Sequence, residues 1–116
     1  MRPFLLLFVI QCFFVQAVFA QYDNIWMFGT NAGISFNGAT PLPVTSAINS
    51  NEAASSVCDA NGNLLFYTDG TTVWDRNNVP MPNGTGLQPV VNGTYSTSQG
   101  AQIVPVIDSP GKYYVF

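Results

Sequence analysis

Apolar and polar positions alternate most clearly between residues 55 and 77, where short runs rich in aromatic and β-branched residues are separated by turn residues. This period of two is typical of strands that bury one face. The turns carry Asn61-Gly62 and Asp69-Gly70, pairs that supply the positive φ angles of tight turns. The sequence therefore predicts an antiparallel meander of three strands, at residues 55–59, 64–68 and 71–75.

The segment before this meander carries a weaker strand pattern. The apolar run 25–28 ends at Gly29, and residues 33–36 alternate before the next turn, which predicts a hairpin. Residues 40–44 contain two prolines, which cannot donate the hydrogen bonds of a sheet, so this segment is expected at a sheet edge or in a connection. The polar residues 46–54 are predicted to be a loop.

The segment after the meander begins with a stretch of turn-forming residues. Residues 78–93 are rich in Pro, Asn and Gly and are predicted to be a long irregular connection. Residues 102–107 are predicted to be a strand broken by Pro105. A turn at 108–111 and a final aromatic strand at 112–116 are expected to follow.

Two of these segments align as a repeat. Asp59 and Gly62 recur as Asp108 and Gly111, with apolar residues before and after them at both places. The shift, about 50 positions, is the length of one four-stranded propeller blade. Residues 26–36 resemble the later half of this unit more loosely. The fold class is therefore predicted to be all-β, with antiparallel meanders that form part of a β-propeller; a β-sandwich is the alternative, because the same strand spacing fits it.

This interpretation has a consequence for stability. The strands would make up the end of one blade, a whole blade and the opening of another, and a blade buries its two faces only against neighbouring blades. Residues 21–116 are therefore expected to be a partial propeller-like domain, truncated at the C-terminus, since Phe116 stops within a strand. Alone, such a piece would expose aromatic faces and strand edges and would tend to aggregate.

The first 20 residues have the pattern of a secretory signal peptide. Arg2 precedes the apolar run 4–10, and a small-residue ending at Ala20 predicts cleavage before Gln21. A retained membrane anchor is the alternative, but the apolar run is shorter than the roughly 20 residues of a spanning helix. The chain is therefore predicted to be secreted, extracellular or on the outer cell surface, with no membrane span after signal cleavage.

Export limits the chemistry of the remaining chain. Cys12 lies in the leader, so Cys58 has no disulfide partner and is expected to be a small buried side chain. The chain has no histidine, and Arg76 and Lys112 are its cations beyond the leader. Thiol catalysis and histidine-based triads therefore lack a basic partner here. Because the net charge is −3, nucleic acid is not an expected partner.

Several blocks in fixed order resemble the mature start of large secreted proteins of the Bacteroidota. The blocks are NIWMFGTNAGISFN at 24–37, NGNLLFYTDG at 61–70, VWDRN at 73–77, MPNG at 81–84, QIVP at 102–105 and KYYVF at 112–116. In that family a propeller-like N-terminal region is followed by PKD-type modules and a sorting domain associated with type IX secretion and gliding motility. The resemblance implies a surface or adhesion role and no catalytic residues to transfer; a PKD module and a sorting domain are expected only in a longer form.

One stretch has alternating oxygen ligands. Asp59, Asn61 and Asn63 resemble the opening of a calcium loop, but the terminal glutamate and further acids of such a loop are missing. Asp and Asn also make the side-chain to backbone hydrogen bonds of ordinary turns, and a plain turn is the preferred interpretation. No cofactor is expected, with calcium as the weak alternative at these three residues.

The candidate binding and catalytic groups are aromatic and acidic residues. Trp26 and Trp74 could stack on sugar rings, although packing between blades is the favoured role for both. Asp69 is a further candidate contact that a turn also explains. A carboxylate pair for glycoside hydrolysis could be drawn from Asp59, Asp69 and Asp75, but nothing in the sequence sets their separation. No catalytic residue is assigned.

Three functions remain. The first is a non-enzymatic secreted or cell-surface module that contacts carbohydrate or protein in adhesion, in the context of gliding motility. The second is a glycan-cleaving propeller enzyme whose catalytic acids lie outside this segment. The third is a structural spacer. The first is preferred because the resemblance implies it, the surface is acidic and polar, and catalytic residue types are missing. The expected partners are an extracellular glycan or surface protein and the remaining blades.

Overall fold

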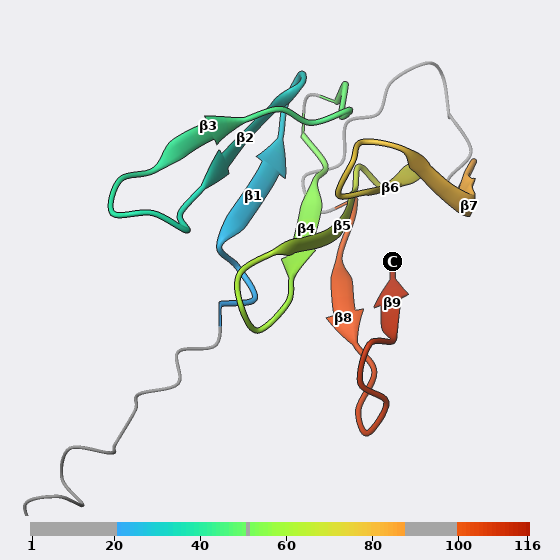
Figure 1. Ribbon diagram of the computed structural model, residues 1–116. Helices are drawn as coiled ribbons and strands as arrows, with labels where there is room; N and C mark the ends of the chain where they lie inside the picture. The colour runs from blue at the N-terminus through green and yellow to red at the C-terminus, as the bar shows by residue number, and fades with distance from the viewer. Residues whose placement is uncertain (1–20, 51, 88–99) are drawn as a thin grey trace, which may run out of the picture.

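The computed structural model describes residues 21–50, 52–87 and 100–116, which form antiparallel strands and, within these ranges, no helix (Figure 1). The strands are β1 (Ile25–Phe28), β2 (Ala32–Ser35), β3 (Leu42–Val44), β4 (Ser55–Cys58), β5 (Leu64–Thr68), β6 (Thr72–Asp75), β7 (Pro80–Thr85), β8 (Ile103–Pro105) and β9 (Tyr113–Val115). They make a first sheet (β1–β3), a central sheet (β4–β7) and a third sheet (β8–β9). The all-β prediction is confirmed. The expected leader, residues 1–20, lies outside the described residues, and among the described residues no helix could span a membrane.

The central sheet confirms the predicted meander. Its strands follow chain order, β4-β5-β6-β7, and each pairs antiparallel with the next. The two turns use glycine as expected, with φ of 81° at Gly62 and 87° at Gly70. Both angles lie in the left-handed region that glycine adopts without steric cost. A bulge at Val57 and Cys58 shifts the register between β4 and β5.

One prediction for this sheet was wrong. Residues 78–93 were predicted to be an irregular connection, but Pro80–Thr85 forms the fourth strand, β7, with Trp74 opposite Pro80 and Thr72 opposite Thr85. The strand lies at the outer edge of the sheet, where a proline need not donate to a further neighbour. Only Gly84 along it is buried, so the sequence carries no alternation there. Residues 88–93 lie outside the described residues.

The first sheet matches its prediction. β1 and β2 form the expected hairpin, and β3 adds to β2 as the edge strand that the prolines indicated, with Pro43 opposite Ile34. Residues 46–54, predicted to be a loop, contain no strand or helix among the described residues. They form one isolated bridge, between Asn49 and Thr30.

The third sheet also matches the elements predicted for it. β8 ends at Pro105, and the turn before β9 has positive φ at Asp108 and Gly111. The aligned Asp59 turn differs: there the strand residue Cys58 is fully buried, whereas its counterpart Ile107 is 86% exposed within a turn. The repeat is present in the order of strand, turn and strand, with positive φ at both Gly62 and Gly111, whereas the residue before the aspartate differs in burial.

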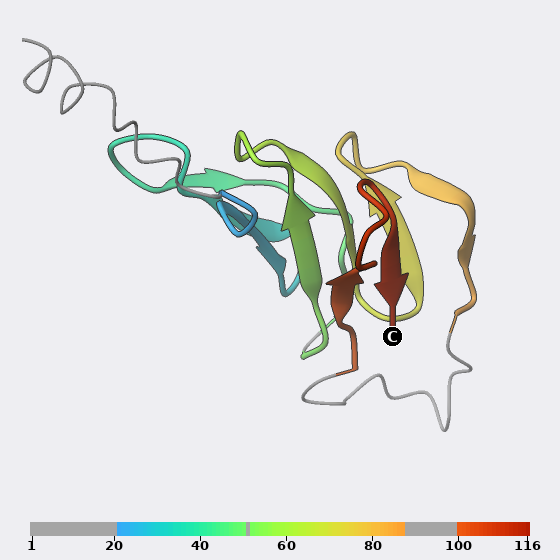
Figure 2. The same cartoon turned by 90° about the horizontal axis from the view of Figure 1, so that it is seen from below.

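The three sheets meet along their first strands. β1 contacts β4, and β4 contacts β8, so the opening strands of successive sheets lie side by side (Figures 1 and 2). Residues 26–36 were predicted to match the later half of the repeat unit. This was wrong, because β1 lies beside β4 and is therefore the first strand of its own sheet. The central sheet therefore lies between the first and the third sheet.

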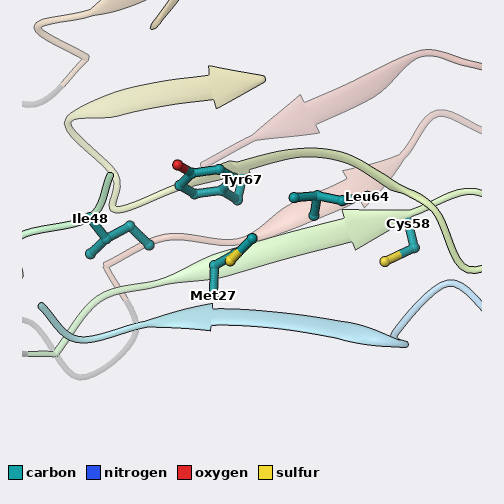
Figure 3. Close-up of a cluster of buried hydrophobic side chains, with 5 residues drawn as sticks. All are labelled: Met27, Ile48, Cys58, Leu64 and Tyr67. Carbon is teal, nitrogen blue, oxygen red and sulfur yellow. The ribbon is translucent and has the colours of Figure 1, made fainter. Parts of the chain in front are cut away.

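The main core lies between the first and central sheets. It contains Met27, Ile48, Cys58, Leu64 and Tyr67, which point toward one another in Figure 3. The prediction that Cys58 is a buried side chain is confirmed, since it is fully buried. Burial raises the pKa of its thiol, because desolvation penalises the charged form.

Candidate functional site

A groove of about 750 Å³ lies between the central sheet and the β8–β9 hairpin. Ser56 and Val57 of β4 line one part of it, and the segment Tyr22-Asp23 lines another. The hairpin contributes Tyr113 and its turn residues. Three segments far apart in the chain therefore build one concave surface, which is the usual shape of a ligand site.

The segment Tyr22-Asp23 is held in place by its backbone. The amide of Cys58 donates to the carbonyl oxygen of Tyr22 at 2.9 Å, and the indole Nε1 of Trp26 donates to the carbonyl oxygen of Asp23 at 2.8 Å. Their side chains stay accessible: Tyr22 is 47% exposed. The groove thus has a fixed wall with an accessible phenol ring and an accessible carboxylate.

The opposite wall is the β8–β9 turn. The amide of Val106 donates to the carbonyl oxygen of Lys112 at 2.9 Å, which closes the turn. Asp108 and Lys112 then line the groove together with Tyr113, whose ring contacts Phe66 edge to face at 5.3 Å. The groove combines carboxylates, one ammonium and tyrosine rings, so it can donate and accept hydrogen bonds and stack on a flat apolar surface.

Sequence reasoning missed this groove. Tyr22, Asp23 and Lys112 were not selected as candidates, because no motif links them and they approach one another only through the stacking of the sheets. The sole signal was the aromatic character of the last strand, which places Tyr113 at the groove.

The candidate Trp26 lies on the outer face of the first sheet. Its ring is 54% exposed and contacts Phe36 edge to face, with ring centroids 5.2 Å apart. The next residue, Met27, points into the core. Trp26 is therefore accessible, beside the groove segment that its indole anchors.

The candidate Trp74 is in β6 of the central sheet, on the face that packs against the first sheet. It stacks on Tyr67 with centroids 5.4 Å apart and planes 19° apart, and it packs against the core that contains Met27. Because Trp26 and Met27 occupy opposite faces of β1, the first sheet separates the two tryptophans. The structure does not bring them together.

The candidate Asp69 is used by the turn between β5 and β6. Its Oδ1 accepts hydrogen bonds from the amide of Thr71 at 2.9 Å, the hydroxyl of Thr71 at 2.8 Å and the amide of Thr72 at 2.9 Å. This is the local side-chain to backbone bonding typical of aspartate in turns.

The stretch of Asp59, Asn61 and Asn63 is also bonded within its own turn. Oδ1 of Asp59 accepts from the amides of Asn61 and Asn63 at 2.8 and 2.9 Å. The side-chain amide nitrogen of Asn63 donates to Oδ2 at 2.9 Å. These bonds, with that of the Asn63 side chain first, lower the pKa of the Asp59 carboxyl. Within the described ranges, no three acidic, cysteine or histidine side chains gather where they could hold a metal ion.

A second turn repeats this arrangement. Oδ1 of Asp75 accepts from the amides of Asn77 and Val79 at 2.8 and 2.9 Å, and these bonds lower the pKa of its carboxyl, that of Val79 most. Both turns span five residues, with an aspartate first, an asparagine third and a positive φ fourth, at Gly62 and at Asn78. The recurrence supports a turn-forming role for this motif.

The chain matches no protein-family model, no curated protein and no solved structure.

Proposed function

We propose that this chain is a non-enzymatic module of a secreted or cell-surface protein and that it contacts extracellular glycan. The observation that carries the proposal is the groove between the central sheet and the β8–β9 hairpin, with its tyrosine rings beside carboxylate and hydroxyl groups. Sugars present flat C–H faces for aromatic rings and hydroxyl groups for carboxylates and amides. The chain has no histidine to serve as a general base.

The arrangement of the sheets supports a propeller-like organisation. The central sheet is a four-stranded antiparallel meander, which is the form of a propeller blade, and the first strands of all three sheets lie side by side as blades do around an axis. Propellers commonly display binding loops on a rigid body of sheets. The resemblance to secreted Bacteroidota proteins supports a role in surface adhesion and gliding, with type IX secretion for a full-length form.

A glycan-binding experiment tests the proposal. The purified chain is screened on an array of extracellular glycans, and hits are measured by calorimetry with wild type and Tyr22→Ala. Tyr114→Ala is the matched control, because it removes an exposed tyrosine that does not line the groove. We expect Tyr22→Ala to weaken binding about 2- to 10-fold, the value of one lost stacking contact, and the control to leave it unchanged.

Two outcomes would contradict the proposal. Absence of binding to every glycan on the array would remove the function. Equal loss of affinity in Tyr22→Ala and Tyr114→Ala would remove the groove as its location.

A further inference from the structure

A second cleft, the inter-sheet cleft, has a volume of about 470 Å³ and lies between the first and central sheets. Ile25 and Met27 of β1 and Val44 at the end of β3 line it from the first sheet. Leu64 of β5 lines it from the central sheet. No residue lines both this cleft and the groove beside the β8–β9 hairpin, so the two are separate. The volume lies within the range of small-molecule sites, about 300–1,000 Å³.

The floor of the inter-sheet cleft is aliphatic. Met27 and Val44 pack over Gly33, where a Cβ would lie 2.7 Å from Sδ of Met27 and 2.9 Å from Cγ2 of Val44. Met27 and Leu64 belong to the core cluster between the two sheets (Figure 3). Among the described residues, no aromatic ring lines this cleft, whereas two tyrosines line the groove. The cleft therefore suits an aliphatic chain better than a sugar ring, which stacks on aromatic side chains.

The cleft also carries hydrogen-bond donors. Arg76, in the turn between β6 and β7, lines it with a guanidinium that has five N–H groups. Within the described ranges, this side chain makes no hydrogen bond and no salt bridge. Asn78 lines the cleft as well, and its Oδ1 accepts from the hydroxyl of Tyr67 at 2.7 Å. Its NH₂ group therefore remains a donor.

The acidic residues near Arg76 do not use these donors. The carboxylates of Asp59 and Asp75 act on Arg76 through charge. Oδ1 of each accepts instead from two backbone amides of its own turn, at 2.8 and 2.9 Å. No carboxylate of the described residues lines the cleft. A positive charge beside an aliphatic floor complements an anion with an apolar body.

We propose that the inter-sheet cleft binds a fatty acid of medium length, with its carboxylate on Arg76 and its chain on the aliphatic floor. A guanidinium can donate two parallel N–H bonds to the two oxygens of a carboxylate, and the NH₂ group of Asn78 supplies a further donor. Burial of methylene groups against Met27, Val44 and Leu64 supplies the remaining affinity. This binding does not depend on glycan contact at the groove, because the two sites share no residue.

An NMR titration with three small probes tests the ligand class. The chain, purified after export, is titrated at neutral pH with hexanoate, octanoate and octanamide, which has the shape of octanoate without its charge. We expect amide shifts around Val44, Arg76 and Asn78. The affinity should rise up to about 4-fold for each methylene added between hexanoate and octanoate. Octanamide should bind about 3- to 10-fold more weakly than octanoate, because the guanidinium is exposed and its ion pair is partly screened.

Variants of Arg76 test the location. Arg76→Gln is expected to weaken octanoate binding about 3- to 10-fold. Arg76→Lys keeps the charge but not the paired N–H groups, so its affinity should lie between those of wild type and Arg76→Gln. Lys112→Gln is the matched control, because it removes the same charge at a residue that does not line the cleft, and octanoate binding should not change. If Arg76→Gln loses its β-sheet circular dichroism, Arg76→Lys decides by the same titration.

Three results would overturn the proposal. They are octanoate shifts that lie away from the cleft or do not occur, equal affinities for octanoate and octanamide, and equal losses in Arg76→Gln and Lys112→Gln, which would indicate an effect of overall charge. Each of these results would leave glycan binding at the groove unaffected, since that binding is measured with Tyr22→Ala.

Discussion

The hydroxyl of Ser56 in β4 donates a hydrogen bond of 2.7 Å to the carbonyl oxygen of Ile25 in β1. The same hydroxyl oxygen accepts from the amide of Met27 at 3.4 Å. One side chain thus joins the first strands of two sheets. Because neither backbone group belongs to the same sheet as Ser56, this pair of bonds fixes how the first sheet sits on the central sheet.

Ser56→Ala is expected to lower the free energy of unfolding by about 1 kcal/mol, because it removes both bonds at a partly buried site. Urea unfolding followed by tryptophan fluorescence measures the change. Ser55→Ala is the control, since its side chain lies on the other face of β4. Equal losses in the two variants would contradict a joining role for Ser56.

The hydroxyl of Tyr67 is expected to contribute more. It donates to Oδ1 of Asn78 at 2.7 Å and accepts from the amide of Ala47 at 2.8 Å. Tyr67→Phe leaves that amide without its partner next to a fully buried ring, and a loss of about 1–3 kcal/mol is expected in urea unfolding. Tyr114→Phe removes an exposed hydroxyl and should change little; a loss as large as that of Tyr67→Phe would refute the assignment.

Substitutions at two glycines with positive φ distinguish the cost of backbone strain from the cost of close packing. Gly29 has a φ of 58° and open space around the position of a Cβ, so Gly29→Ala is expected to cost only the left-handed backbone penalty, about 1 kcal/mol. A Cβ at Gly62 would collide with Oδ1 of Asn37 and would lie 2.9 Å from Oε1 of Gln21. Gly62→Ala should therefore lower the unfolding midpoint further than Gly29→Ala does, and equal midpoints would contradict this.

The Asp59 and Asp75 turns predict a pH dependence of stability. Hydrogen bonds lower the pKa of both carboxyls in the folded chain, so the unfolded chain binds more protons at acidic pH. Their contribution is present above the ordinary aspartate pKa, about 3.9, and is lost as pH falls through the lower folded values. Urea midpoints measured over a pH series should fall in that window. The double variant Asp59→Asn and Asp75→Asn keeps the oxygen acceptors but should have a smaller slope, and an unchanged slope would argue against this origin.

Cys58 offers a probe of the core. Its thiol is buried and has a raised pKa, so at neutral pH it stays protonated and shielded. Labelling by a maleimide is expected to be slow in the folded chain and to reach the rate of a free thiol once denaturant unfolds it. Cys58→Ala supplies the background without this thiol. Fast labelling without denaturant would show that the core between the first and central sheets opens readily.

The local pattern of the sequence determined most strands. Glycines at positions 62 and 70 marked the turns, alternating apolar residues marked β4 to β6, and the prolines placed β3 at an edge, because these effects act over a few residues. β7 could not be found in this way. Its residues are nearly all exposed, and only pairing with β6 makes them a strand.

The candidate site shows the same division. Trp26, Trp74 and Asp69 were candidates by residue type, and the tertiary structure decided their surroundings. Trp26 lies on an open face, Trp74 stacks on Tyr67, and Asp69 is bonded within a turn. The groove joins Tyr22 to Lys112, which are distant in the chain, so no local pattern could reveal it. Strand formation follows from neighbouring residues, whereas grooves and open faces follow from how completed sheets stack, which is a property of contacts between distant segments.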